Sequence, residues 1–296
     1  MMWVRIVSGI VAIAVVSSAI ALGGWYFTIG LSLLVLLGQL EYFQMVLAKG
    51  IAPAAKTTLV ASQVLLLTAA IAPRFVDGMF PIAGTAICFY LLFQPQIATI
   101  ADISTSILGL FYGGYLPSYW LRLRVGLDRA WESASADLVA SSQPVTTATH
   151  WWDPQQLSEG LTLTLLAFCC IWAADIGAYF VGKFFGRTRL SHISPKKTVE
   201  GAVFGVTSSA IVAVLGAWYV GWPYWLWTGL GLGLVVGVAS LLGDLTESMM
   251  KRDAGVKDSG TLIPGHGGIL DRADSYVFTA PLVYYFATLL LPLLTG

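Results

Sequence analysis

Charged residues are scarce in this chain, with 16 Lys and Arg and 16 Asp and Glu among 296 residues, or 11%. Soluble globular domains carry about 25% charged residues, so the composition indicates an integral membrane protein. The formal net charge of zero excludes a general attraction to nucleic acid or another bulk polyanion. Cysteine is also scarce. Cys88, Cys169 and Cys170 lie in apolar runs without a zinc-binding spacing or a disulfide framework, and we interpret them as packing residues.

Hydrophobic residues make up 57% of the chain, and its eleven Trp and twelve Tyr suit the two interfaces of a bilayer. A helix needs about 20 largely apolar residues to cross the hydrocarbon core. We therefore predict an all-α polytopic membrane protein with about nine transmembrane helices, the first retained rather than cleaved as a signal peptide. The expected spans are 6–24, 27–46, 57–73, 79–95, 100–120, 161–181, 200–221, 224–250 and 273–294.

The distribution of basic residues predicts the orientation of these spans. With nine spans and the N-terminus inside, twelve Lys and Arg flank the inner ends and four flank the outer ends. This agrees with the positive-inside rule. We expect a multi-pass protein of a bacterial-type inner (plasma) membrane, with a polar pocket that faces the cytoplasm. Arg122 and Arg124, in the L-R-L-R run, are the exception because they fall outside.

The chain divides into three expected parts. Residues 1–120 should form an apolar transmembrane scaffold of about five helices, and residues 161–296 a motif-bearing catalytic half of about four. Residues 121–160 form the one long hydrophilic connection, which we interpret as a loop with one surface helix near 128–140.

A stripe of polar side chains lies in the eighth expected span. Asp244, Glu247, Ser248 and Lys251 have the i, i+3, i+4, i+7 spacing of one helix face. A charge within hydrocarbon costs about 2.5–3.5 kcal/mol on insertion scales, so both carboxylates should face protein or water. A solvated helix end with internal ion pairs is the alternative, which suits Lys251 and Arg252 better than Asp244. We favour a functional site.

A glycine-rich loop and a second acidic pair follow this stripe. The glycines of P-G-H-G-G at 264–268 allow backbone to approach a ligand such as phosphate closely. Asp271 and Asp274 then open the last expected span. We favour metal ligation for Asp271, whereas helix capping or an ion pair is an equal alternative for Asp274. Hard oxygen ligands predominate and no Cys/His set suits zinc, so Mg²⁺ is the expected cation.

A second polar cluster flanks the loop before the seventh expected span. Asp175 and Lys183 are eight residues apart, on one face of the sixth span. Lys196 and Lys197 follow a proline turn, and Thr198 is a candidate cap for the next helix. A lysine pair beside a helix start suits a triphosphate. The same pair could equally serve only to fix the topology.

These motifs together resemble the signature of the phosphatidate cytidylyltransferases, also called CDP-diacylglycerol synthases. Residues 248–274 contain S-x-apolar-K-R, K-D and H-G-G-x-x-D-R-x-D in the family's order. D-x-x-A-Y-x-x-G-K at 175–183 and S-P-K-K-T-x-E-G at 194–201 are also similar to the family. Ala273 departs from it, in place of a larger apolar residue, which concerns helix packing. The resemblance is strong in the C-terminal half and generic over residues 1–120.

The resemblance implies an enzyme that converts CTP and phosphatidate to CDP-diacylglycerol and pyrophosphate with Mg²⁺. It leaves open a second, monovalent cation and a homodimer. The metal ligands would be Asp244 and Asp271, supported by Glu247 and Asp274. The catalytic group would comprise Lys251, Arg252, Lys257, Asp258, His266 and Arg272. Substrate binding would involve Asp175, Lys183, Ser194, Lys196, Lys197, Thr198, Ser248, Gly267 and Gly268.

Three other functions compete with this interpretation. A secondary transporter would use Asp175 and Asp244 as coupling-ion ligands, but it should have paired broken helices in two halves. Another CTP-using membrane enzyme, such as a polyprenol kinase, should lack the run from K-R to D-R-x-D. A membrane scaffold with incidental charge conflicts with the cost of burying Asp244. Glu41, a lone carboxylate in the second span, belongs either to the site or to a helix interface.

Overall fold

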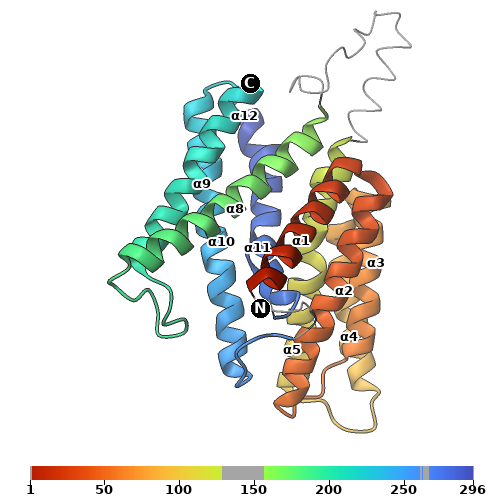
Figure 1. Ribbon diagram of the computed structural model, residues 1–296. Helices are drawn as coiled ribbons and strands as arrows, with labels where there is room; N and C mark the ends of the chain where they lie inside the picture. Colours follow the sequence, from red (N-terminus) through yellow and green to blue (C-terminus); the bar gives the residue numbers. More distant parts are fainter. Residues whose placement is uncertain (1, 129–156, 261, 263–266, 296) are drawn as a thin grey trace, which may run out of the picture.

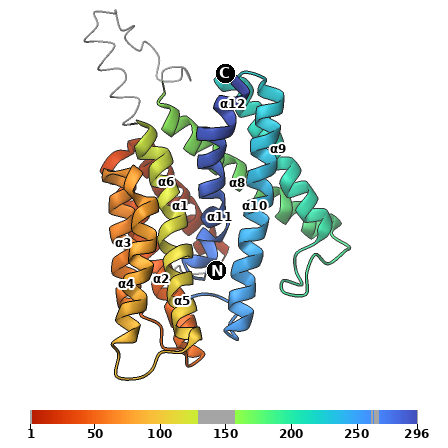
Figure 2. The same cartoon turned by 180° about the vertical axis from the view of Figure 1, so that it is seen from behind.

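The structure is a computed structural model that describes residues 2–128, 157–260, 262 and 267–295. Within these residues the regular elements are helices, apart from isolated bridge positions such as the pair Arg189 and Thr198. The helices of the first half group together on one side of the molecule and those of the second half on the other (Figures 1 and 2). α11 packs against helices of both halves, so it joins the two groups.

The first half of the chain consists of α1 (Met2–Leu22), α2 (Gly24–Ala48), α3 (Ala55–Ile71), the 3₁₀ turn η1 (Pro73–Phe75) and α4 (Val76–Leu92). One further continuous helix follows, made of α5 (Ile100–Leu110), the π-helical η2 (Phe111–Tyr115), α6 (Leu116–Leu121) and the π-helical η3 (Arg122–Gly126). The second half consists of α8 (Glu159–Phe185), α9 (Val199–Val220), α10 (Trp225–Asp253) and α11 (Leu270–Tyr285), extended by η5 (Phe286–Leu290) and α12 (Leu291–Thr295).

These helical segments follow the order of the nine expected spans, with ends that differ by a few residues. Six described segments are long and apolar enough to cross a membrane: Gly24–Ala48, Pro73–Leu92, Glu159–Phe185, Val199–Val220, Trp225–Asp253 and Leu270–Leu294. The prediction of an all-helical, polytopic membrane protein is therefore confirmed. The number of nine crossings stays a prediction, because six of the described segments are identified as long and apolar enough to cross.

The end of the fifth segment corrects the expected start of the hydrophilic loop. The helix continues to Gly126, and Arg122 and Arg124 are both buried. Arg122 donates to both carboxylate oxygens of Asp77, Nη1 at 2.9 Å and Nη2 at 3.1 Å. Arg124 donates through Nε to the carbonyl oxygen of Ile20 at 2.7 Å. The two arginines therefore hold helices together, which explains why they depart from the charge pattern of the loops.

The surface helix expected near 128–140 lies outside the described residues, except for Asp128. The three cysteines are free thiols, as expected. Only Cys170 is buried, whereas Cys169 is exposed on the outer surface of α8.

The loop between α8 and α9 is fixed by hydrogen bonds to the start of α9. The Thr198 side chain accepts from the backbone N–H of Gly201 at 3.1 Å, which confirms the predicted helix cap. The Glu200 carboxylate accepts from the backbone N–H groups of Arg187 and Thr188, each at 3.1 Å. These bonds turn the loop back onto α9 and hold its lysine pair beside the helix start.

Close packing brings both α8 and α10 against α9. A Cβ atom added at Gly205 would lie 2.8 Å from the carbonyl oxygen of Ala174 in α8. One added at Gly233 would lie 2.4 Å from the Cα atom of Ala210 in α9. Small residues allow helices in membranes to approach this closely. The polar clusters of α8 and α10 can therefore face one shared space.

The ion pair of Arg122 gives a test of the fold. We expect Asp77→Asn to destabilise the protein by about 1–3 kcal/mol, because a buried guanidinium then loses its carboxylate partner. The matched control is Asp253→Asn, which breaks the exposed Lys49–Asp253 pair and should cost about 0–1 kcal/mol. Thermal unfolding of the purified proteins in detergent measures both. Equal changes in the stability of the two variants would mean that the buried Arg122–Asp77 pair stabilises the fold no more than the exposed Lys49–Asp253 pair does.

Candidate active site

A cavity of about 800 Å³ lies among α8, α9, α10, α11 and the loop that precedes α9. Most of its polar lining comes from the two sequence clusters, which are separated by the whole of α9. The predicted site residues that line it are Asp175, Lys183, Ser194, Lys196, Lys197, Thr198, Asp244, Lys251, Asp271, Arg272 and Asp274. The structure therefore brings the two predicted clusters into one pocket.

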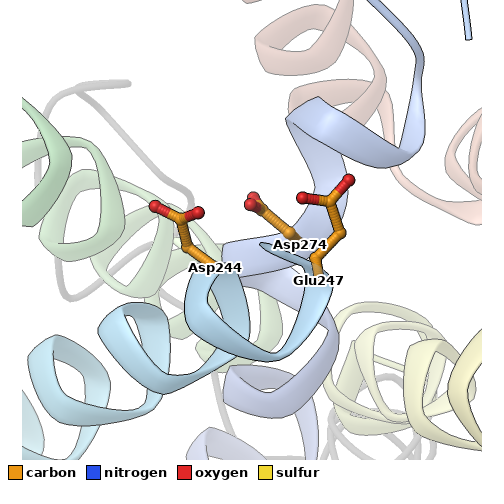
Figure 3. A group of neighbouring side chains, drawn as sticks. All are labelled: Asp244, Glu247 and Asp274. Atoms are coloured by element: carbon orange, nitrogen blue, oxygen red, sulfur yellow. The ribbon is translucent and has the colours of Figure 1, made fainter. Parts of the chain in front are cut away.

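Three carboxylates gather where α10 meets α11. Asp244, Glu247 and Asp274 each offer an oxygen atom, and these three atoms all lie within 4.8 Å of one another (Figure 3). The Glu247 side chain is fully buried, and Asp274 is 8% exposed. Gly243 permits this approach, because an added Cβ would lie 2.5 Å from the carbonyl oxygen of Asp274. We call these three residues the acid triad.

Two lysines balance part of the triad's negative charge. Lys197 forms an ion pair with Asp244. Lys251 lies with Nζ 2.5 Å from Glu247 Oε2 and 2.5 Å from Asp271 Oδ1. Buried carboxylates this close repel one another when ionised, so they require cations nearby. Three hard oxygen donors from two helices fit a Mg²⁺ ion.

Asp271 has a different environment from the triad. Its Oδ2 accepts from the backbone N–H of Ser259 at 2.9 Å and of Gly268 at 2.8 Å, and from Ser259 Oγ at 3.1 Å. Its Oδ1 accepts from Lys251. Among the described residues, the group able to hold a metal contains Asp274 rather than Asp271. Direct ligation of the metal by Asp271 stays a prediction.

The second cluster lines the same cavity. Ser240 Oγ of α10 donates to Asp175 Oδ1 of α8 at 3.4 Å. Lys183 lies at the exposed end of α8, with Nζ 5.6 Å from the ring centroid of Tyr179. Lys196 is exposed, whereas Lys197 points to the triad. Lys197 therefore already contacts the acid triad, whereas Lys196 faces solvent.

Several predicted site residues lie apart from this lining, judged on the residues that the structure describes. Arg252 is exposed and donates to the carbonyl oxygens of Ile193 at 3.4 Å and Val256 at 3.1 Å. Lys257 and Asp258 are exposed on the following loop, and Ser248 is buried. Gly267 packs against the carboxylate of Asp271, and Gly268 against that of Glu41. His266 lies outside the described residues.

Two contacts were missed by sequence reasoning. Ser240 lines the cavity and lies four residues before Asp244, so the helical spacing that found Glu247 would also have found it. Ser259 bonds to Asp271, but nothing in its local sequence indicates that contact. Glu41, whose role was left open, accepts hydrogen bonds from the motif-bearing loop and from the start of α11.

The geometry of the site agrees with the comparison to known proteins. Residues 3–290 match the cytidylyltransferase family. The chain belongs to this family. It is 64% identical over 292 residues to a phosphatidate cytidylyltransferase of Synechocystis sp., which covers 99% of this chain and 98% of that protein. It is 40% identical over 291 residues to the chloroplastic phosphatidate cytidylyltransferase 4 of Arabidopsis thaliana, covering 95% and 72%.

A phosphatidate cytidylyltransferase of Staphylococcus aureus is 47% identical over 127 residues, or 43% of this chain and 49% of that protein. The family and the enzyme class predicted from the sequence are therefore confirmed. The transporter, polyprenol kinase and scaffold alternatives are set aside, because the cytidylyltransferase match covers nearly the whole chain.

The acid triad gives a prediction that does not depend on turnover. We expect Mg²⁺ alone to raise the thermal midpoint of the purified protein. At a Mg²⁺ concentration a hundred times the dissociation constant, the free energy of unfolding should rise by about 2.7 kcal/mol. Asp274→Asn should abolish this effect, because it removes one of three converging oxygens. Asp253→Asn, an exposed acidic residue at the end of the same α10, is the control and should respond like the original protein. A full Mg²⁺ response in Asp274→Asn would exclude the triad as the cation site.

Proposed function

We propose that this chain transfers the cytidylyl group of CTP to the phosphate of phosphatidate, with formation of CDP-diacylglycerol and release of pyrophosphate. One observation carries the proposal: Asp244 and Asp274 of the acid triad line the same cavity as a lysine pair, in a chain 64% identical to a phosphatidate cytidylyltransferase. A lipid phosphate oxygen would form a bond to the α-phosphorus of CTP. The bond between that phosphorus and the bridging oxygen to the β-phosphate would break.

The attacking group needs little help from a base. The second pKa of a phosphate monoester lies near 6, so at neutral pH the lipid phosphate is already largely dianionic. The difficulty is electrostatic, since two polyanions must approach each other in line. Positive groups that line the cavity, and Arg252 next to them in sequence, address this difficulty. Lys183, Lys196 and Lys197 are suited to the CTP phosphates, and Lys251 and Arg252 to the lipid phosphate or to developing charge.

The start of α9 supports the assignment of the lysine pair to the triphosphate. Thr198 caps the helix beside Lys196 and Lys197, and Ser194 lies on the same cavity wall. A helix N-terminus adds partial positive charge to that of two ammonium groups. Lys197 would exchange its contact with Asp244 for one with a phosphate oxygen. This exchange places the nucleotide next to the acid triad.

The donor atoms of the triad fit Mg²⁺, which Asp244, Glu247 and Asp274 would hold. When bound, the ion supplies positive charge to the phosphates and stabilises the leaving pyrophosphate. Lys251 would orient Glu247 through one ion pair and would hold Asp271 close to Glu247 through a second. Asp175, which lines the same cavity, would complete the polar pocket.

The membrane setting suits this pair of substrates. Diacylglycerol chains remain in the bilayer, whereas CTP is soluble. The helix ends and loops that carry Lys183, Lys196, Lys251 and Lys257 are the most basic segments of the chain, and the positive-inside rule assigns them to the cytoplasm. We therefore infer a cytoplasm-facing pocket in which the two substrates meet.

The central test is a direct assay of the reaction. Purified protein in detergent is given radiolabelled CTP, phosphatidate and Mg²⁺, and the labelled lipid and pyrophosphate are measured. We expect equal amounts of both products, and none when phosphatidate or Mg²⁺ is omitted. ATP in place of CTP should give no labelled lipid. The proposal fails if pyrophosphate release does not depend on the lipid.

Asp271 gives a sharper test of the site. We expect Asp271→Asn to fold and insert normally but to lose at least about 100-fold in kcat, because its carboxylate pairs with Lys251 and fixes the loop. Direct ligation would also raise the Mg²⁺ concentration needed for half-maximal activity about tenfold. Initial rates over a Mg²⁺ titration measure both effects, with Asp253→Asn as control. Near-normal turnover would remove Asp271 from the site.

A further inference from the structure

Glu41 of α2 has no part in the proposed reaction, yet its carboxylate is tightly engaged by the motif-bearing half. It is 6% exposed. Its Oε1 accepts from the backbone N–H of Ile269 at 3.0 Å, and its Oε2 from the N–H of Leu270 at 2.9 Å. Oε2 also accepts from Ser259 Oγ at 2.9 Å. All three donors lie more than 200 residues away along the chain, so the contact joins the two halves.

The two backbone donors belong to the first turn of α11. Such N–H groups have no partner within their own helix, and an anion at a helix N-terminus is favourable. Ile269 has no side-chain oxygen to cap the helix, and no side-chain cap is formed there. Glu41 therefore supplies, from another helix, the acceptor that a capping residue would normally provide. The same hydrogen bonds stabilise the buried carboxylate of Glu41.

The glycines on either side of the loop fit this carboxylate. A Cβ atom added at Gly260 would lie 2.4 Å from Glu41 Oε1, and one added at Gly268 would lie 2.3 Å from Oε2. Either contact is too short for any larger residue. Gly260 and Gly268, the latter in the family signature, thus allow the backbone to pack closely against Glu41.

The same contact connects Glu41 to the acid triad. Ser259 Oγ lies between Glu41 Oε2 and Asp271 Oδ2, at 2.9 and 3.1 Å. Asp271 pairs with Lys251, and Lys251 pairs with Glu247 of the triad. A polar chain of five side chains therefore runs from α2 to the proposed cation site.

We infer that Glu41 is a positioning residue. It fixes the start of α11 and the loop before it, and it thereby sets where Asp271 and Asp274 lie relative to α10. It touches neither proposed substrate. Its effect on kinetics rests on the proposed function, whereas its effect on the start of α11 does not.

The first experiment measures the contact without any substrate. Glu41→Gln keeps the size of the side chain but turns one acceptor into an NH₂ group that faces donors. We expect amide hydrogen exchange at Ile269 and Leu270, followed by mass spectrometry in detergent, to become at least about tenfold faster. The control is Asp102→Asn, another buried carboxylate of the first half, which accepts from the N–H groups of Thr99 and Ala52. It should leave this exchange unchanged.

The second experiment separates positioning from stability. Per folded molecule, Glu41→Gln should lower kcat by about 10–100-fold while KM for CTP changes by less than about threefold. Glu41→Asp should recover part of the loss, and Asp102→Asn should keep normal kcat. If Glu41→Gln does not fold, Ser259→Ala removes one of the three bonds and should change both readouts in the same direction by a few fold.

Three results would overturn the inference or its basis. Unchanged exchange at the start of α11 in Glu41→Gln would disprove the contact, whatever the activity. Faster exchange with normal kcat would disprove its role in positioning. If the original protein makes no labelled lipid, the proposed function fails instead, and the exchange experiment still decides whether Glu41 holds α11.

Discussion

The close grouping of three carboxylates at the meeting of α10 and α11 is the constraint on which the rest of the site depends. Like charges within 4.8 Å of one another in a protein interior are unfavourable unless cations balance them. Lys197 and Lys251 do so from two directions. The close contacts of Gly243 with α11 and of Gly205 and Gly233 around α9 are what bring these charges together.

The sequence predicted the fold class and the composition of the cavity well. Helical spacing was enough to place Asp244 and Glu247 on one face, and the cost of a charge in hydrocarbon indicated a shared polar pocket. It favoured Asp271 over Asp274 as a metal ligand, whereas among the described residues Asp274 is the one that groups with Asp244 and Glu247. Only the relative rotation of α11, set by tertiary packing, turns Asp274 to the triad and Asp271 to Lys251 and the loop backbone.

The errors of the sequence analysis have a common physical origin. Arg122 and Arg124 were assigned to a loop because charge usually marks the end of a span, but their partners Asp77 and Ile20 lie in distant helices. Glu41 remained ambiguous for the same reason, since its donors lie in the opposite half of the chain. The spacing of residues along one helix shows which side chains share a face of that helix. It does not show which partners another helix contributes.

The ion pair of Lys197 with Asp244 has a consequence for the order in which ligands associate. The ammonium group cannot serve a nucleotide phosphate and the carboxylate equally well at once. A nucleotide that draws Lys197 away leaves Asp244 with unbalanced charge, which strengthens its attraction for a divalent ion. By thermodynamic reciprocity the ion in turn frees the lysine for the nucleotide. In the proposed reaction each ligand would thus raise the affinity for the other, and the charged complex would assemble cooperatively.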